Sequence, residues 1–277
     1  MSPVRIGLTL PSFREDGEPL VAVARAAEAA GLDGVFAYDH LFRHAADGSL
    51  RPALEFAATM GALAAETRAI TIGSLVARAT LRPAAVLANV FDTVRRIAGE
   101  RVVAGLGAGD EESRAEMETF GYEFGTEASR VDALVASVEA VAARGIPTWV
   151  GGHPDRTAAA VLGAAGWNRW GVAPERFARE VETVRSARAA AGRDPGVLSW
   201  GGLCVLGADD DTARVRAQRL GASARTLVGG PATVAAALRN YVDAGAEWVI
   251  LGPVDSSDPV NAELLATAGE ILSALGL

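Results

Sequence analysis

One unit recurs along this chain and limits its fold more than any other feature: an Ala-rich helical segment, a glycine and a short apolar run. The first copy consists of the segment Leu20–Ala30, Gly31 and the apolar run that begins at Gly34. A glycine just past a helix tolerates the left-handed conformation that ends it. Apolar runs of four to eight residues between such signals are typical of buried parallel strands. The sequence therefore predicts helices that alternate with parallel strands.

Repetition of this unit predicts eight strands, which begin at residues 4, 34, 69, 101, 147, 168, 198 and 248. Helices are predicted over Leu20–Ala30, Ala84–Ile97, Arg130–Ala143, Thr157–Ala165, Pro174–Ala191, Thr233–Ala244 and Asn261–Leu275. Eight alternating β and α units in 277 residues predict an α/β protein with a (β/α)8 TIM barrel, formed by residues 1–277 as a single domain. A doubly wound open sheet is the alternative.

The composition narrows the classes of function. Half of the residues are hydrophobic, which excludes disorder for most of the chain, and the net charge of -8 disfavours nucleic acid and a polybasic membrane anchor as partners. The 26 basic residues are all arginine, so no Schiff-base lysine is available. Neither a secretory signal nor a run of about 18 apolar residues is present, so we expect a cytoplasmic protein.

The sharpest local signal is the pair Asp39-His40, which directly follows the second predicted strand. In a barrel of this type the chemistry lies at the carboxyl ends of the strands. Histidine is the side chain whose ordinary pKa lies nearest neutrality, so it suits proton transfer. An exposed or helix-capping His40 is the alternative. His40, His44 and Asp39 would share a metal ion only on a helix, so no metal site is predicted.

Two glycine-rich segments also follow predicted strands. Gly105–Gly109 lacks a third glycine at the spacing of a dinucleotide fingerprint and lies in mid-chain, so a Rossmann site is disfavoured. It suits the close approach of a flat cofactor to the backbone. Gly151-Gly152, before a predicted helix, is a candidate phosphate site, with a plain loop as the alternative. Cys204 lies within an apolar run and is predicted to be a core residue.

Several stretches together resemble the bacterial luciferase-like superfamily of flavin- and deazaflavin-dependent oxidoreductases, over nearly the whole chain. They are Ala30–Phe36 with Asp39-His40, Ile72–Val76 leading to Arg82-Pro83, Gly99–Arg101 with Gly105–Gly109, Pro147–Gly152, and Gly166–Asn168. No single stretch is decisive, but their common order is specific.

The resemblance implies a cofactor site. A non-prolyl cis peptide behind the cofactor ring would fall at Ser74-Leu75. A histidine matching His40 moves a proton beside the transferred hydride, and an acid at the position of Asp110 takes the opposite role in some members, although that acid is usually the longer glutamate. The cofactor-binding residues implied in this way are Asp39, Ser74, Leu75, Gly107 and Ser113, with the phosphate near Gly151 and Gly152.

The implied activity is hydride transfer between deazaflavin coenzyme F-420 and a small organic substrate. The alternatives are an FMN-dependent monooxygenase, which uses O2 and reduced flavin from a partner reductase, and a non-catalytic protein that binds flavin or deazaflavin. An F-420 reductase is another conceivable partner. The missing lysines disfavour a phosphosugar substrate. The resemblance further implies a homodimer, built through the helices that follow the second and third strands.

Overall fold

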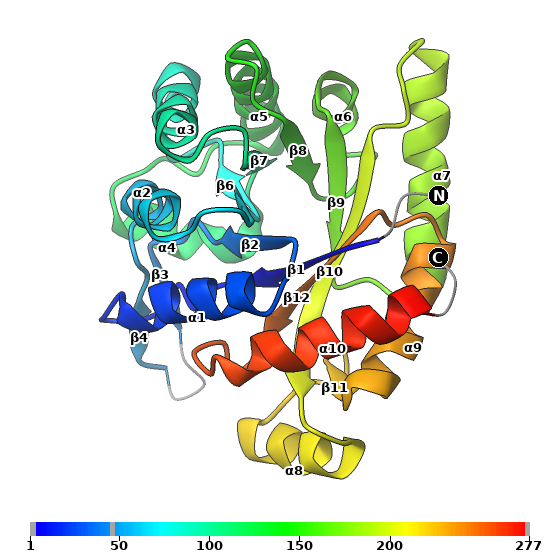
Figure 1. Cartoon of the computed structure of the whole chain (residues 1–277). Helices are drawn as coiled ribbons and strands as arrows, with labels where there is room; N and C mark the ends of the chain where they lie inside the picture. The colour runs from blue at the N-terminus through cyan, green and yellow to red at the C-terminus, as the bar shows by residue number, and fades with distance from the viewer. Residues whose placement is uncertain (1–3, 45–47, 275–277) are drawn as a thin grey trace.

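Eight parallel strands form a closed ring in this computed structural model, which describes residues 4–44 and 48–274 (Figure 1). Each strand pairs with the next, and β10 pairs with both β9 and β12, which closes the ring. The (β/α)8 barrel is therefore confirmed, and the open sheet is wrong. In ring order the strands are β1 (Arg5–Thr9), β2 (Gly34–Ala37), β5 (Thr71–Ser74), β7 (Val102–Gly107), β8 (Thr148–Gly151), β9 (Gly166–Trp170), β10 (Val197–Leu206) and β12 (Trp248–Pro253).

Helices surround this ring and cover its outer face (Figure 1). They bury their apolar faces against the outward side chains of the strands, in one continuous hydrophobic cluster. Each predicted helix is present, with ends that shift by a few residues; the predicted last residue, Leu275, lies outside the described residues. The helices are α1 (Glu18–Ala29), α2 (Phe56–Glu66), α3 (Ala84–Ala98), α5 (Glu127–Ala142), α6 (Ala158–Gly163), α7 (Pro174–Ala190), α9 (Pro231–Asp243) and α10 (Val260–Ala274).

A second, smaller core fills the inside of the barrel. Phe36, Trp149 and Trp248 meet there, with ring centroids 5.5 to 5.9 Å apart. Gly7 and Gly34 face these rings, and a Cβ on either residue would lie 2.8 Å from a ring carbon. The interior is thus packed by pairing large aromatic rings with glycines, as close packing demands when the space is narrow.

Extra elements extend the connections at the carboxyl ends of the strands. The hairpin of β3 (Phe42–His44) and β4 (Leu50–Pro52) follows β2, and the short strand β6 (Ala77–Arg78) follows β5. The other additions are the 3-10 helix η1 (Glu111–Ser113), α4 (Arg114–Thr119), α8 (Asp210–Leu220) and β11 (Leu227–Gly229).

Helices α2, α4 and α8 are absent from the sequence-based prediction. For α8 the reason is its composition, because the helix is rich in charged residues and buries only Ala213. A helix without an apolar stripe gives no periodic signal. Among the described residues no helix is both long and apolar enough to cross a membrane.

Candidate functional site at the barrel mouth

The carboxyl end of β2 brings Asp39 into a buried ionic contact. Its Oδ2 accepts hydrogen bonds from the backbone N–H of Arg78 at 2.9 Å and from Nη1 of Arg82 at 2.7 Å. Burial raises the pKa of the Asp39 carboxyl, against the opposing charge of Arg82. Arg82 also binds Glu55, at 2.8 Å. Asp39 therefore links the ends of β2 and β6 at the barrel mouth.

His40 stands beside a buried ion pair that the sequence did not reveal. Its Nδ1 lies 2.9 Å from Oε1 of Glu116 and 2.7 Å from Nη2 of Arg78. Arg78 and Glu116 are in direct ionic contact with each other, and both are buried. The His40 side chain is 38% exposed. One edge of the imidazole is thus held by charges, and the other faces the mouth.

Glu116 comes from α4, a helix in the connection after β7, and reaches the segment after β2. Its Oε2 accepts the N–H groups of Leu41 at 2.8 Å and Phe42 at 3.4 Å. Burial by itself raises the pKa of Glu116, but hydrogen bonds from His40 and the Leu41 N–H, with the charges of His40 and Arg78, outweigh it and lower this pKa to about 2. Glu116 is therefore an anion at neutral pH.

One nitrogen of the Arg78 guanidinium makes no hydrogen bond to the described residues. Its Nε donates to the carbonyl oxygen of Asp39 at 3.1 Å, and its Nη2 faces His40 and Glu116. Its Nη1 is buried and has no hydrogen-bond partner among the described residues. A buried guanidinium N–H that stays unpaired is costly, which suggests that a bound molecule or water takes it.

The segment after β5 carries the predicted non-prolyl cis peptide, one residue later than expected. It joins Leu75 to Val76, so the prediction of Ser74-Leu75 is wrong in register. The family resemblance predicted which segment carries the bulge. The register of the bulge depends on how Val76 packs against β7 and β8. A Cβ on Gly107 would lie 2.4 Å from Val76, and one on Gly151 would lie 2.7 Å from it. These two glycines thus make room for the bulge.

Ser74 and Leu75, the two residues before Val76, attach this bulge to the sheet and to the inner core. The Ser74 hydroxyl donates to the carbonyl oxygen of Gly105 at 2.7 Å and is fully buried. Leu75 packs into the inner core with Phe36. The Ser74 hydroxyl is therefore committed to the sheet, and its contribution to a site is through the backbone that it holds.

Asp110 and Ser113, both predicted site residues, bind each other. Oδ1 of Asp110 accepts from the Ser113 hydroxyl at 2.9 Å and from the Ser113 N–H at 3.2 Å, which caps η1. Asp110 is exposed, and Ser113 is buried. The acid beside His40 is Glu116, six residues further along. In the sequence Glu116 is one of several acids in a charged segment, so only its burial distinguishes it.

Gly151 and Gly152 lie at the end of β8, as predicted. The Gly152 N–H donates to the carbonyl oxygen of Asn168 at 3.3 Å, and the Gly152 carbonyl accepts from Trp167 Nε1 at 3.0 Å. Helix α6 begins only at Ala158. The expectation of a free Gly152 N–H at a helix start is therefore wrong, because this N–H is used to pair β8 with β9.

Aromatic side chains flank His40 on its open side. The Phe13 ring lies 5.2 Å from the His40 ring, and Tyr38 lies 6.0 Å from Phe13 and 6.3 Å from Trp170. The Tyr38 hydroxyl donates to Thr9 at 2.9 Å, and burial raises the Tyr38 pKa to about 12. This tyrosine stays neutral, so the wall beside His40 is apolar and uncharged.

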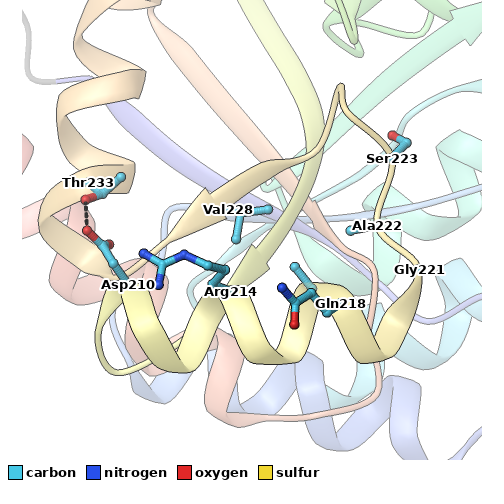
Figure 2. Close-up of a pocket in the computed structure, with 9 residues that line it drawn as sticks. Asp210, Arg214, Gln218, Gly221, Ala222, Ser223, Val228 and Thr233 are labelled. Atoms are coloured by element: carbon cyan, nitrogen blue, oxygen red, sulfur yellow. Dashed lines mark hydrogen bonds between the residues drawn. The ribbon is translucent and has the colours of Figure 1, made fainter.

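A pocket of about 520 Å³ lies between α8, β11 and α9, and none of the residues around His40 lines it (Figure 2). Figure 2 shows Asp210 bonded to Thr233, and the same carboxylate accepts the Gly230 N–H at 2.8 Å. Arg214 binds Asp211 at 2.6 Å. Asp210 therefore caps α9, and Arg214 belongs to a surface ion pair. Both charges serve the fold, and we assign no chemistry to this pocket.

Comparisons with known proteins agree with this architecture. An uncharacterised protein of Mycobacterium tuberculosis is 25% identical over 228 residues, which cover 68% of this chain and 78% of the relative. An F-420-dependent glucose-6-phosphate dehydrogenase of Nakamurella multipartita is 34% identical over 111 residues, 39% of this chain and 32% of the relative. The structure of an F-420-dependent secondary alcohol dehydrogenase with an F-420-acetone adduct aligns with a TM-score of 0.83 at 16% identity, over 98% of this chain and 99% of the other.

The profile of the luciferase-like monooxygenase family matches residues 2–162. That range covers more than half of the chain and contains every sequence-predicted site residue together with Glu116 and Arg78. Family members are oxidoreductases and monooxygenases, and the structural neighbour shares the barrel over its full length. This chain belongs to the luciferase-like monooxygenase family.

Proposed function

We propose that this protein transfers a hydride between coenzyme F-420 and a small, uncharged organic substrate. The observation that carries the proposal is the arrangement at the mouth: His40 is fixed on one edge by the buried Glu116–Arg78 pair and opens on the other beside Phe13 and Tyr38. A histidine held in this way can move the proton that accompanies a hydride.

One feature of the mouth fits a bound cofactor. Nη1 of Arg78 is a buried donor without a partner among the described residues. Leu75, Val76 and Gly107 would hold the ring, whereas Gly152, whose N–H pairs with Asn168, offers a phosphate no free backbone donor. When bound, F-420 supplies or accepts the hydride and, having carbon at position 5, does not pass single electrons to oxygen.

The charges at the mouth support an uncharged substrate. Arg78 and Arg82 each pair with a carboxylate, from Glu116 and Asp39 respectively, and Arg43 lies over the Phe13 ring. The chain has no lysine to bind a substrate phosphate. Although a relative is a glucose-6-phosphate dehydrogenase, these groups favour an alcohol or ketone over a sugar phosphate as the substrate.

A binding titration tests the cofactor. The purified protein is titrated with F-420 and with reduced FMN, and each complex is followed by fluorescence. We expect saturable binding of F-420, followed by turnover with simple alcohols or ketones. Binding of reduced FMN alone, with oxygen consumption on adding substrate, would replace the proposal with the monooxygenase. That alternative is favoured by the name of the family. Binding without turnover of any substrate would favour a cofactor-binding protein.

The variant His40→Gln tests the proton transfer. We expect it to bind F-420 with unchanged affinity and to lose turnover by about 10²–10⁴-fold, the usual contribution of a general acid or base. His44→Gln is the matched control, because His44 packs against Phe42 in the hairpin. Wild-type turnover in His40→Gln would remove His40 from the chemistry.

A further inference from the structure

We propose that Glu116 is a positioning residue that fixes the tautomer of His40, with the proton on Nδ1 and the lone pair on Nε2. In this tautomer Nε2 of His40 can accept a proton from a molecule bound at the barrel mouth. The consequence for catalysis rests on the proposed function above, whereas the tautomer itself does not.

The count of donors around Glu116 supports this assignment. An ionised carboxylate offers about four acceptor sites, two on each oxygen. Oε2 receives the N–H groups of Leu41 and Phe42, and Oε1 faces Nη2 of Arg78 and Nδ1 of His40. All four sites are filled only if His40 Nδ1 carries a proton.

The opposite tautomer creates a repulsive contact. His40 Nδ1, Glu116 Oε1 and Arg78 Nη2 form a triangle, in which Nδ1 lies 2.9 Å from the carboxylate and 2.7 Å from the guanidinium. If Nδ1 accepted a hydrogen bond from Arg78, its lone pair would face the lone pairs of an anion with a pKa of about 2. A proton on Nδ1 in turn places an N–H 2.7 Å from a guanidinium that also can only donate, so each tautomer leaves one mismatched contact. Arg78 Nη2 has Glu116 as an acceptor, whereas the described residues offer Nδ1 no acceptor besides Glu116, and on this ground we assign the proton to Nδ1.

Other groups around His40 do not compete for Nδ1. Phe13 and Tyr38 contact the ring through their aromatic faces and edges, and Tyr38 donates its hydroxyl proton to Thr9. Asp39 bonds to Arg78 and Arg82, and Arg43 lies over the Phe13 ring. Glu116 and Arg78 are therefore the charged groups that act directly on this nitrogen.

The tautomer with the proton on Nδ1 determines that Nε2 is the nitrogen that receives the substrate proton. In alcohol oxidation the substrate O–H bond breaks and its proton moves to Nε2, the C–H hydride leaves for oxidised F-420, and a C=O bond forms. The imidazole becomes an imidazolium, whose Nδ1–H continues to donate to Glu116. The carboxylate thus orients the ring and stabilises the charge that forms on it, as an acid behind a catalytic histidine does in other enzymes.

Nitrogen NMR reads this tautomer directly, without cofactor or substrate. The chain has only three histidines, so the full-length protein labelled with ¹⁵N-histidine gives few imidazole signals, which His40→Gln, His44→Gln and His153→Gln assign. The spectrum is recorded at about pH 9, well above the ordinary imidazole pKa. We expect His40 to carry its proton on Nδ1. A proton on Nε2 in the wild-type protein overturns the proposal.

Two variants separate the roles of the ion pair. In Glu116→Ala only Arg78 still faces Nδ1, so we expect the proton to move to Nε2. In Arg78→Met the carboxylate remains, and we expect the proton to stay on Nδ1. Glu112→Ala removes an exposed acid from the same connection and should leave the tautomer of His40 unchanged. An unchanged tautomer in folded Glu116→Ala would contradict the proposal, and the wild-type spectrum decides if this variant does not fold.

Turnover separates this inference from the function on which it rests. With F-420 as cofactor, Glu116→Ala should lose turnover to about the extent of His40→Gln, while its affinity for F-420 changes little. Failure of the protein to bind F-420 would refute the proposed function and leave the NMR result standing. The opposite tautomer, with F-420 turnover intact, would refute only the role of Glu116.

Discussion

At the scale of single residues, burial and pairing decide what each acid does. Asp110 and Glu116 lie six positions apart in one charged segment, yet Asp110 caps η1 at the surface and Glu116 is buried against His40. Glu116 keeps its charge because the N–H groups and Arg78 around it outweigh the cost of burial. Its ionisation is therefore coupled to the stability of the fold.

This coupling predicts a pH dependence. The pKa of Glu116 falls from 4.5 to about 2 on folding, so its stabilising effect is fully present above about pH 4.5 and is lost as the pH falls toward 2. The free energy of unfolding of the wild type should drop relative to Glu116→Gln by about 2 kcal/mol between about pH 6 and pH 3. Urea denaturation at both pH values measures it, with Glu112→Gln as the control. If the free energy of unfolding changes equally with pH in the wild type and in Glu116→Gln, the ionisation of Glu116 is uncoupled from folding.

At the scale of elements, the bulge after β5 depends on glycines in β7, the neighbouring strand, and in β8, the strand beyond it. Val76 lies where a Cβ of Gly107 or Gly151 would otherwise be, with contacts of 2.4 and 2.7 Å. Such distances are too short for any real Cβ, so the bulge and the glycines need each other. Sequence patterns predicted a glycine-rich strand end but assigned its space to a cofactor alone.

The same substitution should therefore have opposite effects at two places. Gly151→Ala should destabilise the fold by about 1–3 kcal/mol through overpacking against Val76, and Val76→Ala in the same chain should recover part of the loss. Gly61→Ala, inside α2 where a Cβ meets nothing within 4 Å, should stabilise it by about 0.5–1 kcal/mol. Chemical denaturation of the wild type, the single variants Gly151→Ala, Val76→Ala and Gly61→Ala, and the double variant checks both signs. Additive effects of Gly151→Ala and Val76→Ala would refute the contact.

At the scale of the whole molecule, α3 presents an apolar stripe to solvent. Val86 and Ile97 are 50% and 55% exposed and lie on one face of the helix, with the partly buried Val90 between them. Exposed apolar surface of this kind on a helix of the barrel suits contact with another protein. The homodimer that the family resemblance implies stays a prediction, and α3 is the face that we propose for it.

We therefore expect Ile97→Glu to turn a dimer into a monomer, because an unpaired carboxylate in an apolar interface is costly. Light scattering coupled to size exclusion measures the mass. Val215→Glu is the matched control, since Val215 is 68% exposed on α8, outside the helix ring. A wild-type monomer, or a dimer that persists in Ile97→Glu, would exclude this face of α3 as the dimer interface.

The sequence by itself determined the barrel, its strand order and the location of Asp39 and His40 at the mouth. These follow from local signals, because helix periodicity, terminal glycines and apolar runs act over a few residues. The tertiary structure alone decided which acid faces His40, since that contact joins residues 76 apart and depends on how α4 packs. The cap formed by Asp110 and Ser113 is a local contact between residues three apart. The tertiary structure also showed that the cis peptide follows Leu75. Long-range packing sets the contact between Glu116 and His40, and no local pattern encodes it.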